Sequence, residues 1–342
     1  MRNAEPFMAH TLSIIVVALN EGRNIARLIR GLEALQKPPG VALEIILVDG
    51  GSSDETIRVA ERDGFTRIIE TAGASIPACR NRGVRESTGE WLAFLDADCE
   101  PADDWLLHAA RLMQSPGPRI LGWPVEPPDP PTWVQAAWHA HWTHKNYRRE
   151  TMDGEEVASS QGFRLVTTRN MVLHRTVFED LGGFDEELPT GEDTDFVFRA
   201  HVKGIPVLGA PALRVVHHGE PRTLGPFFRQ QLWHANRTSY GRILRKTGAR
   251  VGGNALLFTA AFSAGLVLLA AAAGALAAGR ASLAAACVLP LAALVLLPAV
   301  LMASRARRWD LVPRLAVLYA AYGLARSLDL AGFFRAKRSW KK

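Results

Sequence analysis

The sequence predicts an α/β protein with a Rossmann-like, mostly parallel sheet, followed by a C-terminal transmembrane helical hairpin. Three observations predict it. Apolar, β-branched runs alternate with amphipathic helical patterns in the first part of the chain. Polar and acidic residues follow several of these runs, at the strand ends where such sheets bind ligands. Between Arg250 and Arg305, the only charged residue is Arg280, whereas charges before this stretch are frequent and mixed.

The first β-α unit begins with Leu12–Ala18 (LSIIVVA), which is apolar almost throughout. Such a run is typical of a strand buried on both faces of a parallel sheet. Asn20–Gly22 then forms a turn, and Asn24–Leu35 has apolar residues at helical spacing. We therefore expect a strand, a turn and a helix in this order.

The second unit repeats this scheme after a proline-glycine breaker. We expect a strand at Leu43–Val48, a turn at Asp49–Asp54 and a helix at Glu55–Asp63. Ile68–Glu70 is expected to form a third, short strand. The alternation of strands and helices indicates a doubly wound sheet.

The stretch Trp91–Glu100 (WLAFLDADCE) predicts a buried strand that ends in two carboxylates, Asp96 and Asp98. Alternation along an extended chain places both on one side, where a hard cation can accept oxygen ligands. Two such acids are weak evidence alone, because loop triplets of this kind are commonly solvated. Their position after a β-α strand favours a divalent ion that bridges a diphosphate.

Two further strands are expected at Phe163–Thr167 and Leu213–Val216, the second just before His217 and His218. Between them, the acidic segment Gly191–Asp195 opens a helical pattern. Carboxylates at a helix N-terminus are stabilised by the helix dipole, which explains part of this segment. Three acids in four residues exceed what capping requires, so we expect a chemical role.

The stretches Ala255–Ala278 and Ala281–Ser304 each contain about 24 uncharged residues, and roughly 20 suffice to cross a bilayer. Arginines and a lysine flank both outer ends, and the positive-inside rule therefore places these ends in the cytoplasm. Pro226–Tyr240 is expected to lie along the membrane surface. Leu311–Phe334 is interrupted by charges and is expected to be interfacial.

These patterns predict four segments. They are a cytosolic α/β domain at 1–225, an interfacial helix and linker at 226–250, two transmembrane helices at 251–305, and an interfacial amphipathic helix with a basic tail at 306–342.

The remaining composition indicates a cytoplasmic setting. We attribute most of the net charge of +6 to arginines that flank the membrane, so it does not indicate nucleic-acid binding. The three cysteines lack any CxxC spacing, which argues against a disulfide framework or a zinc site. The apolar run at 13–19 does not resemble a signal peptide. We therefore expect a multi-pass protein of the inner (plasma) membrane with its catalytic domain in the cytoplasm.

Four segments together resemble a known family: SIIVVALNE, ILVDGGSSDET, RNRGVRESTGEWLAFLDADCEP and GGFDEELPTGEDTDFVFRA. In order and spacing they are similar to the inverting family 2 glycosyltransferases, and the resemblance spans roughly Leu12 to His218. It implies a GT-A fold, the fold of nucleotide-diphospho-sugar transferases. It also implies a nucleotide-sugar donor, typically a UDP-sugar, and Mn²⁺ or Mg²⁺ as cofactor.

The resemblance implies donor-binding roles at seven positions. Asp49 matches the acid that recognises the nucleotide base, because a carboxylate can accept a hydrogen bond from the ring N–H. Asp96 matches the first acid of the DxD motif, which faces the sugar or ribose. The donor-binding set is Ala18, Asn20, Glu21, Asp49, Arg80, Asn81 and Asp96.

Metal and catalytic roles are implied in the same way. Asp98 matches the metal-binding acid of the DxD motif, and His217 or His218 lies where some GT-A enzymes supply another metal ligand; we assign His217. Asp193 matches the catalytic base, with Glu192 beside it near the acceptor. In an inverting transfer such a base takes the proton of the acceptor hydroxyl.

One departure bears on the product. Polysaccharide synthases of the family carry a QxxRW motif, which Gln230–His234 resembles only loosely, and two spans are few for a polymer channel. We therefore favour transfer of a single sugar to a lipid or cell-envelope glycan, with polyprenyl phosphate as a natural candidate. A subunit that extends an envelope polysaccharide, or a catalytically silent nucleotide-sugar-binding scaffold, remains the alternative.

Overall fold

The structure is a computed structural model that describes residues 10–63, 65, 67–144, 149–158, 165–235 and 253–330. It divides the chain into two compact units. The described residues between 10–128 and 149–220 form the first, which we call the sheet unit. Those within 129–144, 221–235 and 253–330 form the second, the helical unit.

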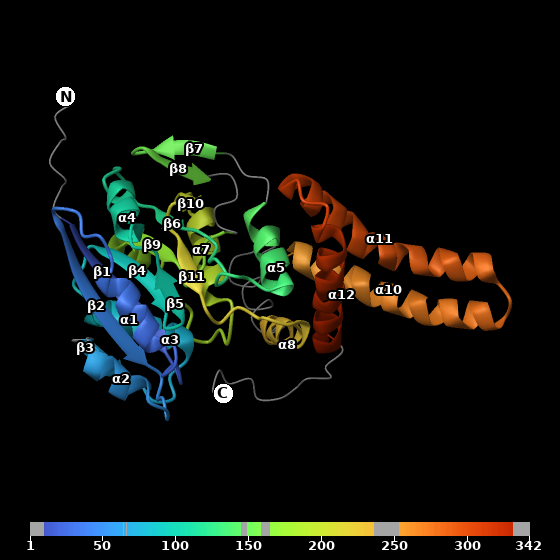
Figure 1. The fold of residues 1–342 in the computed structure, drawn as a ribbon, viewed down its shortest axis with the longest axis horizontal. Helices are drawn as coiled ribbons and strands as arrows, with labels where there is room; N and C mark the ends of the chain where they lie inside the picture. The colour runs from blue at the N-terminus through green and yellow to red at the C-terminus, as the bar shows by residue number, and fades with distance from the viewer. Residues whose placement is uncertain are drawn as a thin grey trace. The chain divides into compact units, whose positions relative to one another are not determined.

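The sheet unit is built on a nine-stranded sheet of order β3-β2-β1-β4-β9-β6-β10-β8-β7 (Figure 1). Its parallel part joins β3, β2, β1 and β4, whereas β9 runs antiparallel to both of its neighbours. The strands are β1 His10–Ala18, β2 Val41–Asp49, β3 Arg67–Glu70, β4 Trp91–Asp96, β6 Ile120–Gly122, β7 Arg149–Met152, β8 Glu155–Ala158, β9 Met171–His174 and β10 Val207–Gly209. A separate antiparallel pair joins β5 Cys99–Pro101 to β11 Val215–His217.

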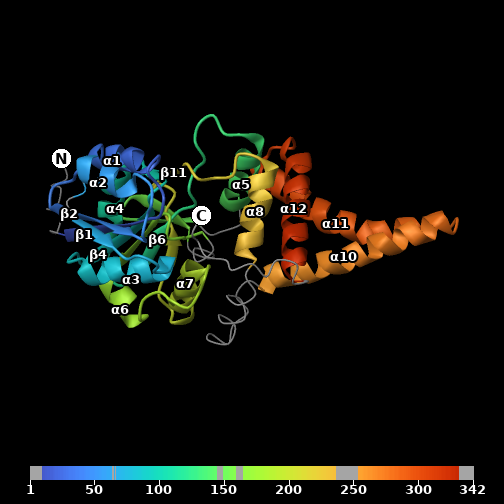
Figure 2. The same cartoon turned by 90° about the horizontal axis from the view of Figure 1, so that it is seen from below.

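Helices cover both faces of the sheet, and Figure 2 shows the two helical layers on opposite sides of the strands. Along β1, Ile14 and Val16 pack with one layer, whereas Ile15 and Val17 pack with the other. This alternation follows from the period-two geometry of a strand. The first layer contains α1 Ile25–Glu33, α2 Thr56–Asp63 and α4 Trp105–Met113; the second contains α3 Ile76–Glu86, α6 Arg175–Asp180 and α7 Glu192–Val202.

The predicted α/β fold with a mostly parallel sheet is therefore confirmed. The strands and helices of the first two β-α units and the third strand lie within two residues of the expected positions. The prediction of a strand at Phe163–Thr167 is wrong for its described residues, because residues 165–167 form no strand, and 163–164 lie outside the described residues. The strand expected at Leu213–Val216 begins two residues later. Hydrophobicity alone does not distinguish a buried loop from a buried strand.

The helical unit contains α5 Trp133–Thr143, α8 Leu224–His234, α10 Gly253–Ala277, α11 Ala281–Ala306 and α12 Leu311–Leu330. Buried apolar residues of α5, α8, α11 and α12 form one core. In it, the ring of Trp138 lies 4.9 Å from that of Phe227, centroid to centroid. The helix expected at Pro226–Tyr240 corresponds to α8, and positions 236–240 lie outside the described residues.

Two helices of this unit, at Ala255–Ala277 and Ala281–Ala306, are long and apolar enough to cross a membrane, judged over the described residues. Only 22% and 11% of the most apolar stretch of each helix is buried. This is little for core helices of a soluble protein. Leu257, Val267 and Leu297 are about 70% exposed. A large exposed apolar surface of this kind is typical of a membrane-facing segment.

The candidate nucleotide-sugar and metal site

The carboxyl ends of the central strands bring three predicted site residues to one edge of the sheet. In the parallel register, Ala18 pairs with Asp49 and Val17 pairs with Asp96. The last residues of β1, β2 and β4 thus lie at the same level, although they are far apart in the sequence. This is the edge at which open α/β sheets bind ligands.

Asp49 organises the turn after β2. It is fully buried, and its Oδ1 accepts the backbone N–H groups of Gly51 and Ser52 at 2.8 and 2.7 Å. Its Oδ2 accepts the Ser52 hydroxyl at 2.5 Å. Gly51 has a φ of +98°, a left-handed conformation that favours glycine.

The turn after β1 is tied to this second turn by polar contacts. The Asn20 amide oxygen accepts the backbone N–H of Ser53 at 2.9 Å, and the Asn20 N–H donates to the Ser52 hydroxyl. The Glu21 N–H donates to the Thr56 hydroxyl at 2.8 Å. The two loops therefore form one polar surface, made of residues from both β-α units.

Arg80 joins the two acidic motifs. It projects from α3 with only 4% of its side chain exposed. Its Nη2 lies 2.7 Å from the Asp96 Oδ1, and its Nη1 forms a short ion pair with the Glu192 carboxylate. Residues 112 positions apart in the sequence thus meet in one buried network. Because guanidinium is always charged, it can hold two carboxylates together.

The acidic segment at the start of α7 separates into three roles. Asp195 is fully buried and pairs with Arg199 at 2.7 Å, within the same helix. Glu192 is buried against Arg80. Asp193 is partly exposed, and its Oδ1 accepts the backbone N–H of Thr194. The ion pair with Arg199 therefore accounts for Asp195. Glu192 and Asp193 remain as the candidates for a chemical role.

Glu192 has an unusual protonation equilibrium. Burial raises its pKa, Arg80 lowers it, and the nearby Asp193 carboxylate raises it again, with a net value of about 7. Near neutral pH this carboxyl group therefore exchanges between its neutral and ionised forms. Such a shift is common at functional sites.

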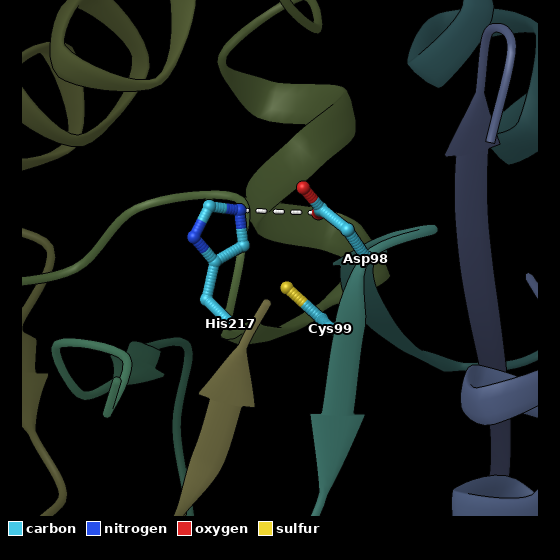
Figure 3. A group of neighbouring side chains, drawn as sticks. All are labelled: Asp98, Cys99 and His217. Carbon is cyan, nitrogen blue, oxygen red and sulfur yellow. Dashed lines mark ion pairs between the residues drawn. The ribbon is translucent and has the colours of Figure 1, made fainter. Parts of the chain in front are cut away.

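The second acid of the DxD motif lies beside a histidine (Figure 3). Pairing of β5 with β11 sets Cys99 opposite His217. The His217 Nε2 lies 3.1 Å from the Asp98 Oδ1. Gly219 follows, and a Cβ at this position would lie 2.2 Å from the Asp98 Oδ2. A side chain at position 219 would therefore displace the Asp98 carboxylate from its place beside His217.

Asp98, Cys99 and His217 could hold a metal ion, because one ligand atom from each lies within 4.8 Å of the others. Burial raises the pKa of the Cys99 thiol well above its usual value, and a thiol that stays protonated is a poor ligand. The carboxylate and imidazole that remain suit Mn²⁺, and the carboxylate suits Mg²⁺. The donor set therefore fits the expected cofactor.

The structure separates the two neighbouring histidines. The His218 Nε2 is hydrogen-bonded to the Glu100 carboxylate at 2.7 Å, and His218 does not belong to the cluster that contains Asp98. β11 ends at His217, and the turn that follows brings the His218 side chain to Glu100. The geometry thus favours His217.

Asn81 lies in a different environment from Arg80. Its amide donates to the Phe184 carbonyl at 2.9 Å and to the Glu186 carboxylate at 2.8 Å, and its oxygen accepts the Phe184 N–H. It also lines a cavity of about 530 Å³ together with residues of α3 and α6. None of the acids of the DxD motif or of α7 lines this cavity, so we do not assign the donor to it.

Sequence reasoning did not single out Arg169, Glu220, Gly219 or Cys99. Arg169 Nη1 lies 2.5 Å from the Glu220 Oε1, and the same oxygen lies 3.1 Å from the His217 Nδ1. These contacts join segments 51 positions apart in the sequence. The only local signal is the short spacing of His217, Gly219 and Glu220.

Comparison with known proteins identifies the family. The family model described as glycosyl transferase family 2 matches residues 13–182. Glycosyltransferase AglE of Haloferax volcanii is 28% identical over 255 residues, which cover 71% of this chain and 79% of that protein. Beta-monoglucosyldiacylglycerol synthase of Trichormus variabilis is 27% identical over 212 residues, which cover 59% of this chain and 42% of that protein.

A solved structure shares the fold. It is the mannosyltransferase PcManGT from Pyrobaculum calidifontis in complex with GDP-Man and Mn²⁺, with a TM-score of 0.58 and 17% identity. The alignment covers 95% of this chain and 88% of that one. The chain belongs to glycosyl transferase family 2 and is a glycosyltransferase with a GT-A fold.

Proposed function

We propose that this enzyme transfers a single sugar, with inversion, from a nucleotide-diphosphate sugar to a lipid or cell-envelope glycan acceptor. The donor is a UDP-sugar in the first instance. The observation that carries the proposal is the Arg80 network, because it unites Asp96 of the DxD motif with Glu192 beside Asp193. A donor-side acid and the proposed base thereby belong to one site in the sheet unit.

The loops after β1 and β2 are the proposed nucleotide-binding surface. Ala18, Asn20 and Glu21 form its first part, and Asp49 is proposed to accept the ring N–H of the base. Arg80 and Asp96 lie toward the sugar diphosphate, and the predicted contribution of Asn81 stays a prediction. The solved structure in complex with GDP-Man makes guanosine nucleotides a necessary part of any donor screen.

Asp98 and His217 are the proposed ligands of Mn²⁺ or Mg²⁺. When bound, the ion neutralises charge on the departing diphosphate. Asp98 is ionised for this role. Burial alone would raise its pKa, but His217 and Arg169 lower the pKa by more, so that it lies below its usual value.

Asp193 is proposed to take the proton of the acceptor hydroxyl as the new glycosidic bond forms on the opposite side from the leaving diphosphate. Its partial exposure leaves it accessible to an acceptor. Glu192, paired with Arg80, is placed to tune the charge beside it. Together these carboxylates supply the base and its electrostatic surroundings.

The proposed acceptor and cellular site are based on the helical unit. Two apolar helices support anchorage in the inner membrane, with the sheet unit at the cytoplasmic face. An enzyme held there has direct access to lipid substrates such as polyprenyl phosphate. One relative is named for a glucosylated diacylglycerol product, which favours a lipid acceptor.

The test is a screen of UDP- and GDP-sugars with purified full-length protein, Mn²⁺ and membrane lipid extract. We expect one labelled sugar to be added to a lipid, and Asp193→Asn to lower turnover by about 10²–10⁴-fold while donor affinity stays nearly unchanged. Polymeric product would favour the polysaccharide-extending subunit. Donor binding without turnover in any combination would favour the silent scaffold, and an active Asp193→Asn variant would contradict the proposed base.

A further inference from the structure

A chain of buried polar contacts extends from the proposed metal site into the sheet unit. The His217 Nε2 lies 3.1 Å from the Asp98 Oδ1, and its Nδ1 lies 3.1 Å from the Glu220 Oε1. The same Glu220 oxygen lies 2.5 Å from the Arg169 Nη1. The side chains of Asp98, His217 and Glu220 are only 9–17% exposed. The two nitrogens of the imidazole thus have different partners.

We propose that Glu220 is a positioning residue for the metal site: it accepts the His217 Nδ1–H and thereby leaves Nε2, which lies beside Asp98, as the nitrogen that would bind the divalent cation. This inference rests on the proposed function, since it takes His217 as a metal ligand. A neutral histidine carries its proton on one nitrogen, and the hydrogen bond made there decides which nitrogen can bind a metal. A carboxylate partner also raises the basicity of the imidazole and so makes it a better metal ligand.

Arg169 holds Glu220 in this role. The guanidinium of Arg169 lies 2.5 Å from the Glu220 Oε1 and provides the counter-charge for this largely buried carboxylate. Arg169 and His217 contact the same oxygen, so the guanidinium fixes the carboxylate that faces the ring.

The backbone supports this geometry. β11 ends at His217, and the chain turns through Gly219 against Asp98, where a larger residue would overlap the Asp98 Oδ2. The turn brings Glu220 back to the ring three positions earlier.

The neighbouring histidine provides an internal comparison. His218 also pairs with a carboxylate, that of Glu100, at 2.7 Å. It lies outside the group formed by Asp98, Cys99 and His217. Both histidines at the end of β11 thus have a carboxylate partner, but of the two imidazole rings it is that of His217 whose second nitrogen contacts the Asp98 carboxylate. This difference makes Glu100→Gln a matched control.

The experiment measures Mn²⁺ affinity of the full-length protein by electron paramagnetic resonance titration, without substrate. Glu220→Gln preserves the side-chain shape but removes the charge. We expect the Kd for Mn²⁺ to rise about 10–100-fold, whereas Glu100→Gln leaves it unchanged. In a His217→Ala background, Glu220→Gln should cause no further loss, because the two residues act as one unit.

A merely structural role predicts something different: a lower Tm in chelator with an unchanged Mn²⁺ Kd in the folded protein, and this result would overturn the inference. If Glu220→Gln does not fold, Arg169→Gln provides the same test, with a Kd rise expected through the loss of the anchor of Glu220. If the unaltered protein binds neither Mn²⁺ nor Mg²⁺, the metal assignment of the proposed function fails as well. Normal binding by the unaltered protein and an unchanged Kd in the variant refute only the role of Glu220.

Discussion

Arg80 and Glu192 form a buried ion pair that connects α3 to the first turn of α7. The second guanidinium nitrogen of Arg80 holds Asp96 at the end of β4. The donor-side acid and the acidic pair at the proposed base thus depend on one cation. This relationship leads to the first two predictions.

Replacement of Arg80 by glutamine should lower the free energy of unfolding by about 3–5 kcal/mol, because it leaves a buried carboxylate without its counter-ion. Chemical denaturation measures the loss. Arg82→Gln, on the same helix but 47% exposed, serves as the control and should cost less than about 1 kcal/mol. Adding Glu192→Gln to Arg80→Gln should restore part of the stability; a further loss in the double variant would argue against the pair as the cause.

Stability should depend on pH through Glu192. Its pKa in the folded protein is about 7, against an ordinary value of 4.5. Between these values the folded state binds more protons than the unfolded state, so the free energy of unfolding falls as the pH rises, in total by on the order of 3 kcal/mol. Glu192→Gln lacks this contribution and should gain in Tm relative to the unaltered protein between pH 5 and pH 8. Glu61→Gln, at an exposed position, serves as the control. An equal pH dependence of Tm in both variants would contradict the shift of Glu192.

Asp49 combines a structural and a proposed ligand-binding role, which two variants can separate. Asp49→Asn removes the charge that accepts the N–H groups of Gly51 and Ser52, and should cost about 1–3 kcal/mol of stability. If Asp49 also accepts a hydrogen bond from the nucleotide base, its replacement should lower UDP affinity by at least about tenfold. Calorimetric titration measures this affinity. Ser52→Ala removes only the hydroxyl contact and should keep UDP affinity within a few-fold. Unchanged UDP binding by Asp49→Asn would exclude the base-reading role.

The apolar surface of α11 should be required for membrane integration. Leu297 is 68% exposed near the middle of the candidate span. Leu297→Arg should weaken insertion by about 2.5–3.5 kcal/mol, so that a larger share of the protein is extracted from membranes by alkaline carbonate. Val202→Arg changes a residue of the sheet unit that is 57% exposed, and should have no such effect. Equal extraction of both variants would count against a membrane-spanning α11.

The sequence by itself determined the β-α units, the acids at the ends of β2 and β4, and the two apolar helices. Each of these depends on local periodicity or on a run of one residue type, and therefore can be recognised without the fold. The segment at 163–167 is the counter-example, because its apolar composition suits a buried loop as well as a strand. In the same way, the resemblance to family 2 followed from short motifs in a given order.

Only the tertiary structure decided how these residues meet. The pairing of β11 with β5 set His217 beside Asp98, whereas His218 lies in the turn after β11 and contacts Glu100. Likewise, the pairing of Arg80 with Glu192 and of Arg169 with Glu220 joins segments distant in the sequence. Such contacts depend on register and on packing across the sheet, and neither has a local signal in the chain.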